Sequence, residues 1–194
     1  MRHCVDILWL WDQKIFFWVN RFAGSGLDPI FGWTTVFGNI SVLLAAIFLG
    51  LLIWDARGIF KKFPPILLSV ISAAAVGQWI KHATHRPRPL LYFSDAIVNG
   101  QVVVHTLFKP IRNYFSFPSG HAVVVFAAVT ALVYLYGRKA RPLYFLAALV
   151  GISRVYVGAH FPSDVIGGAL IGSGISWGAL EIWRRFFKAP PRMD

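Results

Sequence analysis

The stretch Ser153-Arg154-Val155-Tyr156-Val157-Gly158-Ala159-His160-Phe161-Pro162-Ser163-Asp164 separates two strongly apolar segments of the chain. Ionisable side chains beside a membrane core are costly to desolvate, so their presence there indicates a functional site. Asp164 follows His160 by four residues, so its carboxylate can accept a hydrogen bond from one imidazole nitrogen and leave the other free as a nucleophile or base. Arg154 supplies a fixed positive charge for an anion. We interpret the stretch as a candidate catalytic centre.

The composition indicates a membrane protein. Of 194 residues, 57% are hydrophobic and 16% are aromatic, which is too apolar for a soluble domain of this size. The net charge of +11 could attract nucleic acid, but the basic residues lie between apolar runs rather than along one polar face. We therefore expect anionic lipid, and no nucleic acid, as the partner. The single cysteine, Cys4, excludes an internal disulfide framework and forms no zinc pattern.

The apolar segments predict an all-α, polytopic membrane helical bundle that forms one domain over residues 1–194. Residues 5–22 mix aromatic and charged side chains, and we expect this N-terminal helix to be retained and either to lie in the interface or to make a sixth crossing. Five further spans are expected, at about 27–54, 64–80, 122–136, 143–157 and 164–183, and the first of these is expected to break near Gly38-Asn39. Residues 90–117 form the longest connection and are expected to hold a short interfacial helix or a lid on the extracytoplasmic side.

Basic residues predict the orientation. One side of the bundle receives Arg57, Lys61, Lys62, Arg138, Lys139, Arg141, Arg184, Arg185, Lys188 and Arg192. By the positive-inside rule this side is cytoplasmic, so residues 81–121 and 153–164 face outward. The outward side also carries Lys81, Arg86, Arg88, Lys109 and Arg112, which weakens the contrast, although we assign several of these residues to ligand binding.

Three separated stretches therefore reach the same outer side, and their side chains are complementary. Lys81, Arg88 and Arg154 provide three cations, two of which are guanidinium groups able to grip phosphate oxygens bidentately. Ser119 and Gly120 stand at a helix start, where free backbone amides and the helix dipole attract an anion. The imidazoles that remain for proton and phosphoryl transfer are those of His121 and His160.

Each motif alone has a plain structural interpretation. His160 and Asp164 could satisfy each other at a helix start, Ser119 could be a helix cap, and basic side chains could be interface anchors. Their occurrence together, in order and on one side, favours a functional site. Outside the motifs, we expect His82, His85 and Arg86 to be loop residues rather than substrate contacts, and His105, Lys109 and Arg112 to contact headgroups rather than a second phosphate or a sugar. We expect the small residues of the last span to pack within one subunit rather than at a dimer interface; they are Gly167, Gly168, Gly172, Gly174 and Gly178.

Lys81-x6-Arg88-Pro89, Pro118-Ser119-Gly120-His121 and Ser153-Arg154-x5-His160-x3-Asp164 resemble, position for position, the three signature motifs of the type 2 phosphatidic acid phosphatase superfamily. The resemblance extends over residues 64–183. It implies that His160 attacks phosphorus to form a phosphohistidine, that Asp164 orients His160 and that His121 protonates the leaving oxygen. It also implies a mechanism with no metal and no cofactor, and a phosphate held by Lys81, Arg88, Ser119, Gly120 and Arg154.

We therefore expect a lipid phosphatase of the bacterial cytoplasmic membrane with its site on the periplasmic face, because so short a chain has little extramembrane structure with which to recognise a soluble substrate. Undecaprenyl diphosphate, phosphatidylglycerol phosphate, phosphatidic acid and lipid A phosphate remain open as substrates, as does the oligomeric state. The alternatives are a phosphotransferase that passes phosphate from lipid to lipid, and a non-hydrolytic carrier of anionic lipid.

Overall fold

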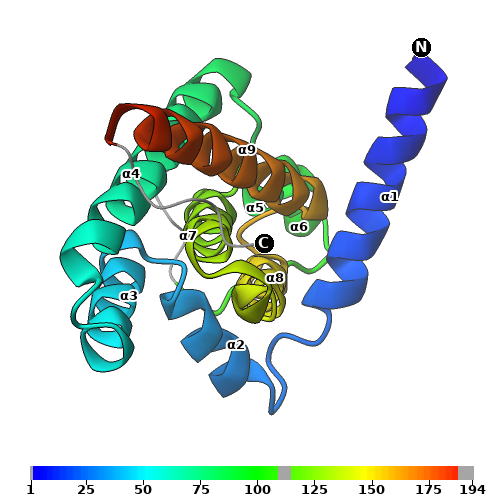
Figure 1. The fold of residues 1–194 in the computed structure, drawn as a ribbon. Coiled ribbons are helices and arrows are strands. Elements are labelled where there is room, and N and C mark those ends of the chain that lie inside the picture. The colour runs from blue at the N-terminus through cyan, green and yellow to red at the C-terminus, as the bar shows by residue number, and fades with distance from the viewer. Residues whose placement is uncertain (1, 109–114, 188–194) are drawn as a thin grey trace.

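The computed structural model describes residues 2–108 and 115–187, and this part of the chain is α-helical without a β-strand. Figure 1 shows a bundle around α7, with α1 standing at its side. The helices are α1 (Arg2–Asn20), α2 (Asp28–Val36), α3 (Ile40–Trp54), α4 (Ile59–Thr84), α5 (Pro89–Tyr92), α6 (Ser94–Val98), α7 (Gly120–Tyr136), the 3₁₀ turn η1 (Gly137–Ala140), α8 (Leu143–Tyr156) and α9 (Pro162–Phe187). The predicted all-α fold is confirmed.

Three of the described helical segments are long and apolar enough to cross a membrane: α4, α7 with η1, and α9. The pair α2 and α3 passes the same test as one broken span, bent by 77°. Helix α8 has 14 residues and is therefore about 21 Å long, against a hydrocarbon core of about 30 Å. The chain is thus an integral membrane protein, and the fifth span at 143–157 and the sixth by α1 stay predictions.

The break between α2 and α3 falls at Gly38 and Asn39, where the sequence predicts it. Asn39 begins α3 as an N-cap, since its Oδ1 accepts hydrogen bonds from the amides of Ser41 at 2.9 Å and Val42 at 3.4 Å. Gly38 is buried at the bend. The bend turns α2 against α8.

Small residues let α9 approach α7 closely. A Cβ added to Gly172 would lie 2.2 Å from the carbonyl oxygen of Val123, and one added to Gly168 would lie 2.8 Å from the carbonyl oxygen of Ser119. Helix α7 contributes a buried face of small side chains, including Ala127 and Ala131. The expected packing within one subunit is found at Gly167, Gly168 and Gly172, whereas added Cβ atoms at Gly174 and Gly178 would meet open space.

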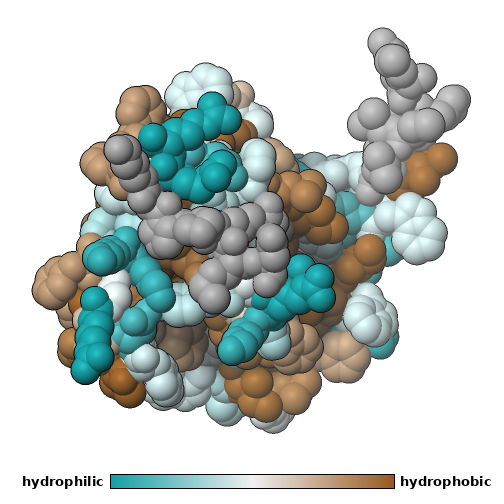
Figure 2. Space-filling model, viewed as in Figure 1, coloured by the Kyte–Doolittle hydropathy of each residue, from teal (hydrophilic) through white to brown (hydrophobic). Residues whose placement is uncertain are grey.

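The two ends of the bundle differ in character. The N-termini of α7 and α9 and the C-termini of α4 and α8, which carry the three motifs, lie at one end. The opposite end carries the described basic residues expected there, from Arg57 to Arg185: Lys62 lies over the ring of Tyr136, and Tyr134 and Arg184 both bond to Glu181. Figure 2 shows hydrophilic side chains gathered on the end of the bundle that faces the viewer, with hydrophobic side chains around its flanks. Lys188 and Arg192 lie outside the described residues.

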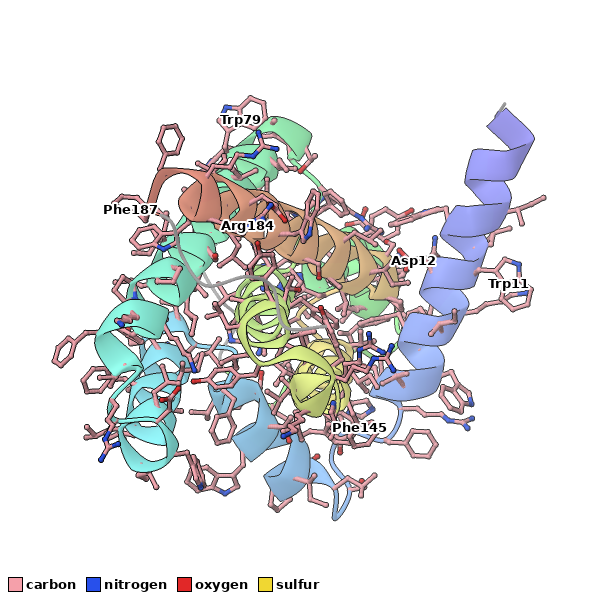
Figure 3. The ribbon with its side chains drawn as sticks, viewed as in Figure 1. Trp11, Asp12, Trp79, Phe145, Arg184 and Phe187 are labelled. Atoms are coloured by element: carbon pink, nitrogen blue, oxygen red, sulfur yellow. The ribbon has the colours of Figure 1, made fainter. Side chains whose placement is uncertain are left out.

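Helix α1 is amphipathic and turns its polar and aromatic inner face toward α8 and α9. Phe16 and Asn20 are buried, and Asp12 is only 6% exposed, whereas Trp11 is 59% exposed. Figure 3 shows Asp12 pointing toward the bundle and Trp11 pointing away from it. The side-chain amide of Asn20 donates to the carbonyl oxygen of Tyr156 at 2.8 Å, which ties α1 to the end of α8.

Candidate active site

The helix ends bring all eight predicted site residues to one region. Lys81 lies in the last turn of α4, which ends where His85 adopts a left-handed φ of 50°. Ser119 is the N-cap of α7, and its amide donates to the carbonyl oxygen of Asp164 at 3.0 Å, which joins the second motif to the third. The positive charges of Arg154, Lys81 and Arg88 all act on the ring of His121.

His160 lies in the short connection between α8 and α9 and is 2% exposed. Its Nδ1 atom lies 3.5 Å from Oδ2 of Asp164 and 3.4 Å from the hydroxyl of Ser116. The ring nitrogen facing the carboxylate is therefore Nδ1, which leaves Nε2 on the other side of the ring. Burial lowers the pKa of His160 to about 3, although the hydrogen bond with Asp164 acts to raise it. The imidazole is neutral at physiological pH.

Asp164 is fully buried in the first turn of α9. Its Oδ2 atom accepts hydrogen bonds from the hydroxyl of Ser116 and from the amide of Phe161 at 2.8 Å. Its Oδ1 atom accepts from Nη1 of Arg86 at 2.5 Å. With both oxygens held, the carboxylate has a fixed orientation toward His160.

Lys81, Arg88 and Arg154, together with the start of α7 at Ser119 and Gly120, form a candidate phosphate cup, and three of its buried polar atoms have no hydrogen-bond partner. Within residues 2–108 and 115–187, the buried side-chain nitrogens and oxygens that lack a partner are Nε of Arg88, Oγ of Ser119 and Nε of Arg154. Leaving such an atom unpaired costs about 1–3 kcal/mol, and buried polar groups are nearly always paired. All three belong to the predicted phosphate-binding set, and an anion with several acceptor oxygens could pair with them together.

The three cations of this cup are not neutralised by carboxylates in the described part of the chain. Nη1 of Arg154 donates to the hydroxyl of Thr35 on α2, and Nη1 of Arg88 donates to the carbonyl oxygen of Ala159 at 3.3 Å. The ammonium group of Lys81, a residue that is 8% exposed, makes no hydrogen bond or ion pair with a described residue. Neutral partners thus hold the two guanidinium groups and leave the positive charge for a ligand.

A cavity of about 280 Å³ adjoins the cup on the side of His121. It lies between the start of α3 and the facing sides of α4 and α7. Its lining residues are Gly38, Asn39, Ile40, Ala74, Gly77, Gln78, Lys81, Gly120, His121, Val123 and Val124. A group bonded to a phosphate in the cup therefore has space beside the imidazole of His121.

Sequence reasoning missed five residues that support the predicted ones: Asp12, Thr35, Arg86, Ser116 and Ser163. Arg86 lies in the loop expected for it, but its side chain reaches Asp164. The signal for Asp12 was its spacing from Phe16 and Asn20, which places a charged residue on the inner face of an amphipathic helix. His82 and His85, by contrast, are exposed and contact the ring of Phe115.

The expected headgroup contacts lie only partly within the described chain. Lys109 and Arg112 lie outside the described residues. His105 is exposed, and its backbone is tied to α1, because its amide donates to Oδ1 of Asn20 at 2.9 Å and its carbonyl oxygen accepts from Nδ2 at 2.9 Å.

The bundle and the cup define an integral membrane protein with a buried cationic site beside a histidine. The family model of the PAP2 superfamily matches residues 64–188, and the chain belongs to that superfamily. The chain is 33% identical to an undecaprenyl-diphosphatase of Sulfolobus acidocaldarius over 129 residues, which cover 64% of this chain and 58% of the relative. It is 31% identical to a lipid A 1-phosphatase of Rhizobium etli over 129 residues, which cover 65% of this chain and 53% of the relative.

Solved structures support the fold. The crystal structure of Aquifex aeolicus LpxE superposes with a TM-score of 0.71 at 29% identity, covering 87% of this chain and 94% of that one. The PAP2 type phosphatidylglycerolphosphate phosphatase from Bacillus subtilis superposes with a TM-score of 0.68 at 22% identity, covering 93% of this chain and 88% of that one. The chain spans little more than half the length of the two curated relatives above.

Proposed function

We propose that the chain is a membrane lipid phosphatase that hydrolyses a phosphate monoester or diphosphate on a lipid headgroup through a phosphohistidine, with no metal and no cofactor. The proposal rests on one observation. The same site contains three unpaired buried donors, on Arg88, Ser119 and Arg154, and the neutral buried imidazole of His160. A phosphate supplies the acceptors that these donors lack, and a neutral histidine supplies the nucleophile.

In the first step, the phosphate binds to Lys81, Arg88 and Arg154 and to the free amides at the start of α7, the residues Ser119 and Gly120. Nε2 of His160 attacks phosphorus and the bond to the leaving oxygen breaks. His121 gives a proton to that oxygen. Asp164 accepts the hydrogen bond from Nδ1–H of His160 and stabilises the positive charge that the ring gains.

In the second step, His121 accepts a proton from water as the water oxygen attacks the phosphohistidine. The bond between phosphorus and Nε2 of His160 breaks, inorganic phosphate leaves and the imidazole returns to its neutral form. General acid and base catalysis of this kind contributes a rate factor of about 10² to 10⁴. The three cations, which are in place before the reaction, stabilise the charge spread over the equatorial oxygens.

The relatives favour a lipid as the substrate, because their names refer to undecaprenyl diphosphate and to the 1-phosphate of lipid A. Phosphatidylglycerol phosphate and phosphatidic acid are the other candidates. We place the site on the periplasmic face of the bacterial cytoplasmic membrane, because the motifs lie at the end of the bundle opposite the basic cluster around Arg57, Arg138 and Arg184.

The test is phosphate release by purified protein in detergent from these four lipids and from a soluble sugar phosphate. The wild type should release phosphate from at least one lipid, and His160→Ala should abolish release. Retained release by His160→Ala would refute the proposed nucleophile. A carrier would bind lipid without release, and a phosphotransferase would give a new phosphorylated lipid on thin-layer chromatography when an acceptor lipid is added.

A further inference from the structure

Arg86 is the centre of a polar network outside the proposed phosphate cup. Its Nη1 atom donates to Oδ1 of Asp164 at 2.5 Å and to the hydroxyl of Ser163 at 2.6 Å. Its Nη2 atom donates to Oδ2 of Asp12 at 2.6 Å. The guanidinium carbon lies 4.6 Å from the ring centroids of both Trp9 and Phe161, so cation–π contacts add to the hydrogen bonds.

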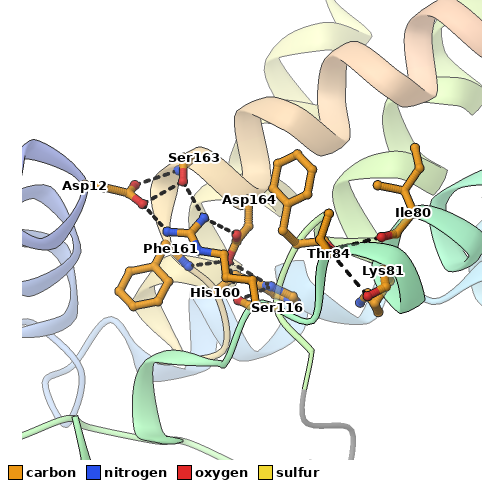
Figure 4. A network of polar contacts seen from close by, with 11 residues as sticks. Asp12, Ile80, Lys81, Thr84, Ser116, His160, Phe161, Ser163 and Asp164 are labelled. Carbon is orange, nitrogen blue, oxygen red and sulfur yellow. Dashed lines mark hydrogen bonds and ion pairs between the residues drawn. The ribbon is translucent and has the colours of Figure 1, made fainter. Parts of the chain in front are cut away.

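Asp12 connects this network to α1. Its Oδ1 atom accepts the amide hydrogen of Ser163 at 2.8 Å, and its Oδ2 atom accepts the hydroxyl hydrogen of Ser163 at 2.6 Å (Figure 4). Asp12 therefore binds both Arg86 and the residue directly before Asp164. Trp9, three residues earlier on α1, contributes the ring beside the guanidinium group. Helix α1 thus supplies two of the groups that hold Arg86.

The orientation of Asp164 depends on this support. Arg86 donates a hydrogen bond to Oδ1 of Asp164, whereas Oδ2 accepts hydrogen bonds from the hydroxyl of Ser116 and from the amide of Phe161. The carboxylate of Asp164 also interacts electrostatically with the positive charges of Lys81 and Arg88. Without Arg86, a fully buried carboxylate would turn toward those cations, because a buried charge must be paired. That turn would pull Oδ2 away from Nδ1 of His160 and neutralise part of the phosphate cup.

We propose that Arg86, held by Asp12 of α1, is a positioning residue that fixes Asp164 and through it the tautomer and orientation of His160, so that docking of α1 completes the active site. The proposal rests on the proposed function for its kinetic consequence. The guanidinium group suits the task because its planar fork can donate to Asp12 and Asp164 at the same time. An ammonium group at this position is a single point charge and cannot span both carboxylates as well.

The kinetic test compares Arg86→Gln, Arg86→Lys and Asp12→Asn with Glu181→Gln, which changes a carboxylate paired with Arg184 at the opposite end of the bundle. Misplacing a reacting group by about 1 Å costs about a hundredfold in rate. Arg86→Gln should lower kcat by about a hundredfold and Asp12→Asn by about tenfold, with KM within about threefold of the wild type. Arg86→Lys should recover part of the loss, and Glu181→Gln should match the wild type.

A structural readout makes the inference independent of activity. ¹⁵N NMR of histidine-labelled protein, with His160→Ala to assign the signal, should show the Nδ1–H tautomer in the wild type and a tautomer mixture in Arg86→Gln and Asp12→Asn. Size-exclusion chromatography gives the folded fraction, by which kcat is normalised. Ser163→Ala provides a milder variant, because it retains the direct contact between Arg86 and Asp164.

Failure of the positioning role of Arg86 and failure of the proposed function would give different results. A normalised kcat for Arg86→Gln within twofold of the wild type, or an unchanged His160 tautomer in both variants, would overturn the positioning role. Equal loss of kcat and folded fraction would also overturn it, since that result means a purely structural role. If the wild type releases no phosphate from any lipid, the proposed function fails, and the tautomer comparison alone decides the inference.

Discussion

Gly38 lies directly against the ring of His121: a Cβ added to Gly38 would stand 2.3 Å from Cδ2 of the imidazole and 2.6 Å from Cγ. Gly38 lies in this position because the chain bends between α2 and α3, and Asn39 stabilises the bend by capping α3. The proposed general acid is thus positioned by the absence of a side chain on a neighbouring segment.

Gly38→Ala should therefore displace the His121 ring and lower kcat by about a hundredfold. Gly32→Ala is the matched control, because Gly32 lies on α2 and an added Cβ there meets nothing within 4 Å. The measurement is phosphate release by the two purified variants at equal folded concentration. Equal activity of both variants would mean that the His121 ring has no fixed place in the reaction.

Thr35→Val should weaken phosphate binding. Its hydroxyl accepts a hydrogen bond from Nη1 of Arg154, and hydrogen bonds to charged groups are worth about 1.5–3 kcal/mol. Valine has the same shape without the acceptor, so the guanidinium group loses its fixed orientation. The inhibition constant of inorganic phosphate should rise by about tenfold. Thr34→Val is the control, since the Thr34 hydroxyl donates within its own helix to the carbonyl oxygen of Ile30; a similar rise in both variants would argue against a specific role of Thr35.

Gly172→Ala should destabilise the bundle, because the added Cβ would lie 2.2 Å from the carbonyl oxygen of Val123 and force α9 away from α7. Overpacking a tight interior costs about 1–3 kcal/mol. Gly174→Ala, on the same helix in open space, should be neutral or slightly stabilising. Thermal unfolding in detergent compares the two variants. Similar unfolding temperatures would show that α7 and α9 do not pack as closely as described.

The sequence predicted the parts of the site that lie on short local patterns. Prolines and glycines mark where α4 ends and α7 begins, and apolar runs place those ends on the same side, so the convergence of Lys81, Ser119 and His160 followed from segment order alone. The break at Gly38 was also readable, because glycine and asparagine interrupt an otherwise apolar run.

The supporting contacts could not be predicted in the same way. Asp12 and Arg86 are 74 residues apart, and nothing in either local pattern states that α1 lies beside the loop after α4. Thr35 and Arg154 are 119 residues apart and meet only because α2 bends across α8. Such pairs depend on how helices pack in three dimensions, whereas periodicity shows only which face of a helix is buried.

Phosphate release should persist in EDTA. Lys81, Arg88 and Arg154 already place three cations around the proposed phosphate site, and their charge repels a divalent metal ion at the same place. Within the described chain, no three His, Cys, Asp or Glu side chains form a group that could hold a metal ion. The assay compares wild-type activity before and after chelation and after addition of Mg²⁺. Loss of activity in EDTA with recovery in Mg²⁺ would reinstate a metal-dependent mechanism.

Acidification should lower the stability of the folded protein, because His160 is buried in its neutral form. Burial holds its pKa at about 3 in the folded protein, whereas an exposed histidine in the unfolded chain has a pKa of about 6.5. Between these values the unfolded chain binds a proton that the folded protein does not, so the stability contributed by neutral His160 is complete above pH 6.5 and is lost progressively as the pH falls toward 3. At pH 4.5, two pH units below the pKa of the unfolded chain, the loss amounts to roughly 3 kcal/mol.

His160→Gln removes this titration, so the variant should lose less stability than the wild type between pH 7.5 and pH 4.5. His85→Gln, which changes an exposed histidine of the neighbouring loop, should follow the wild type. Thermal unfolding of all three proteins in the same detergent at both pH values provides the comparison. If the wild type and His160→Gln lose stability in parallel, His160 titrates like an exposed histidine, and burial does not keep the proposed nucleophile neutral.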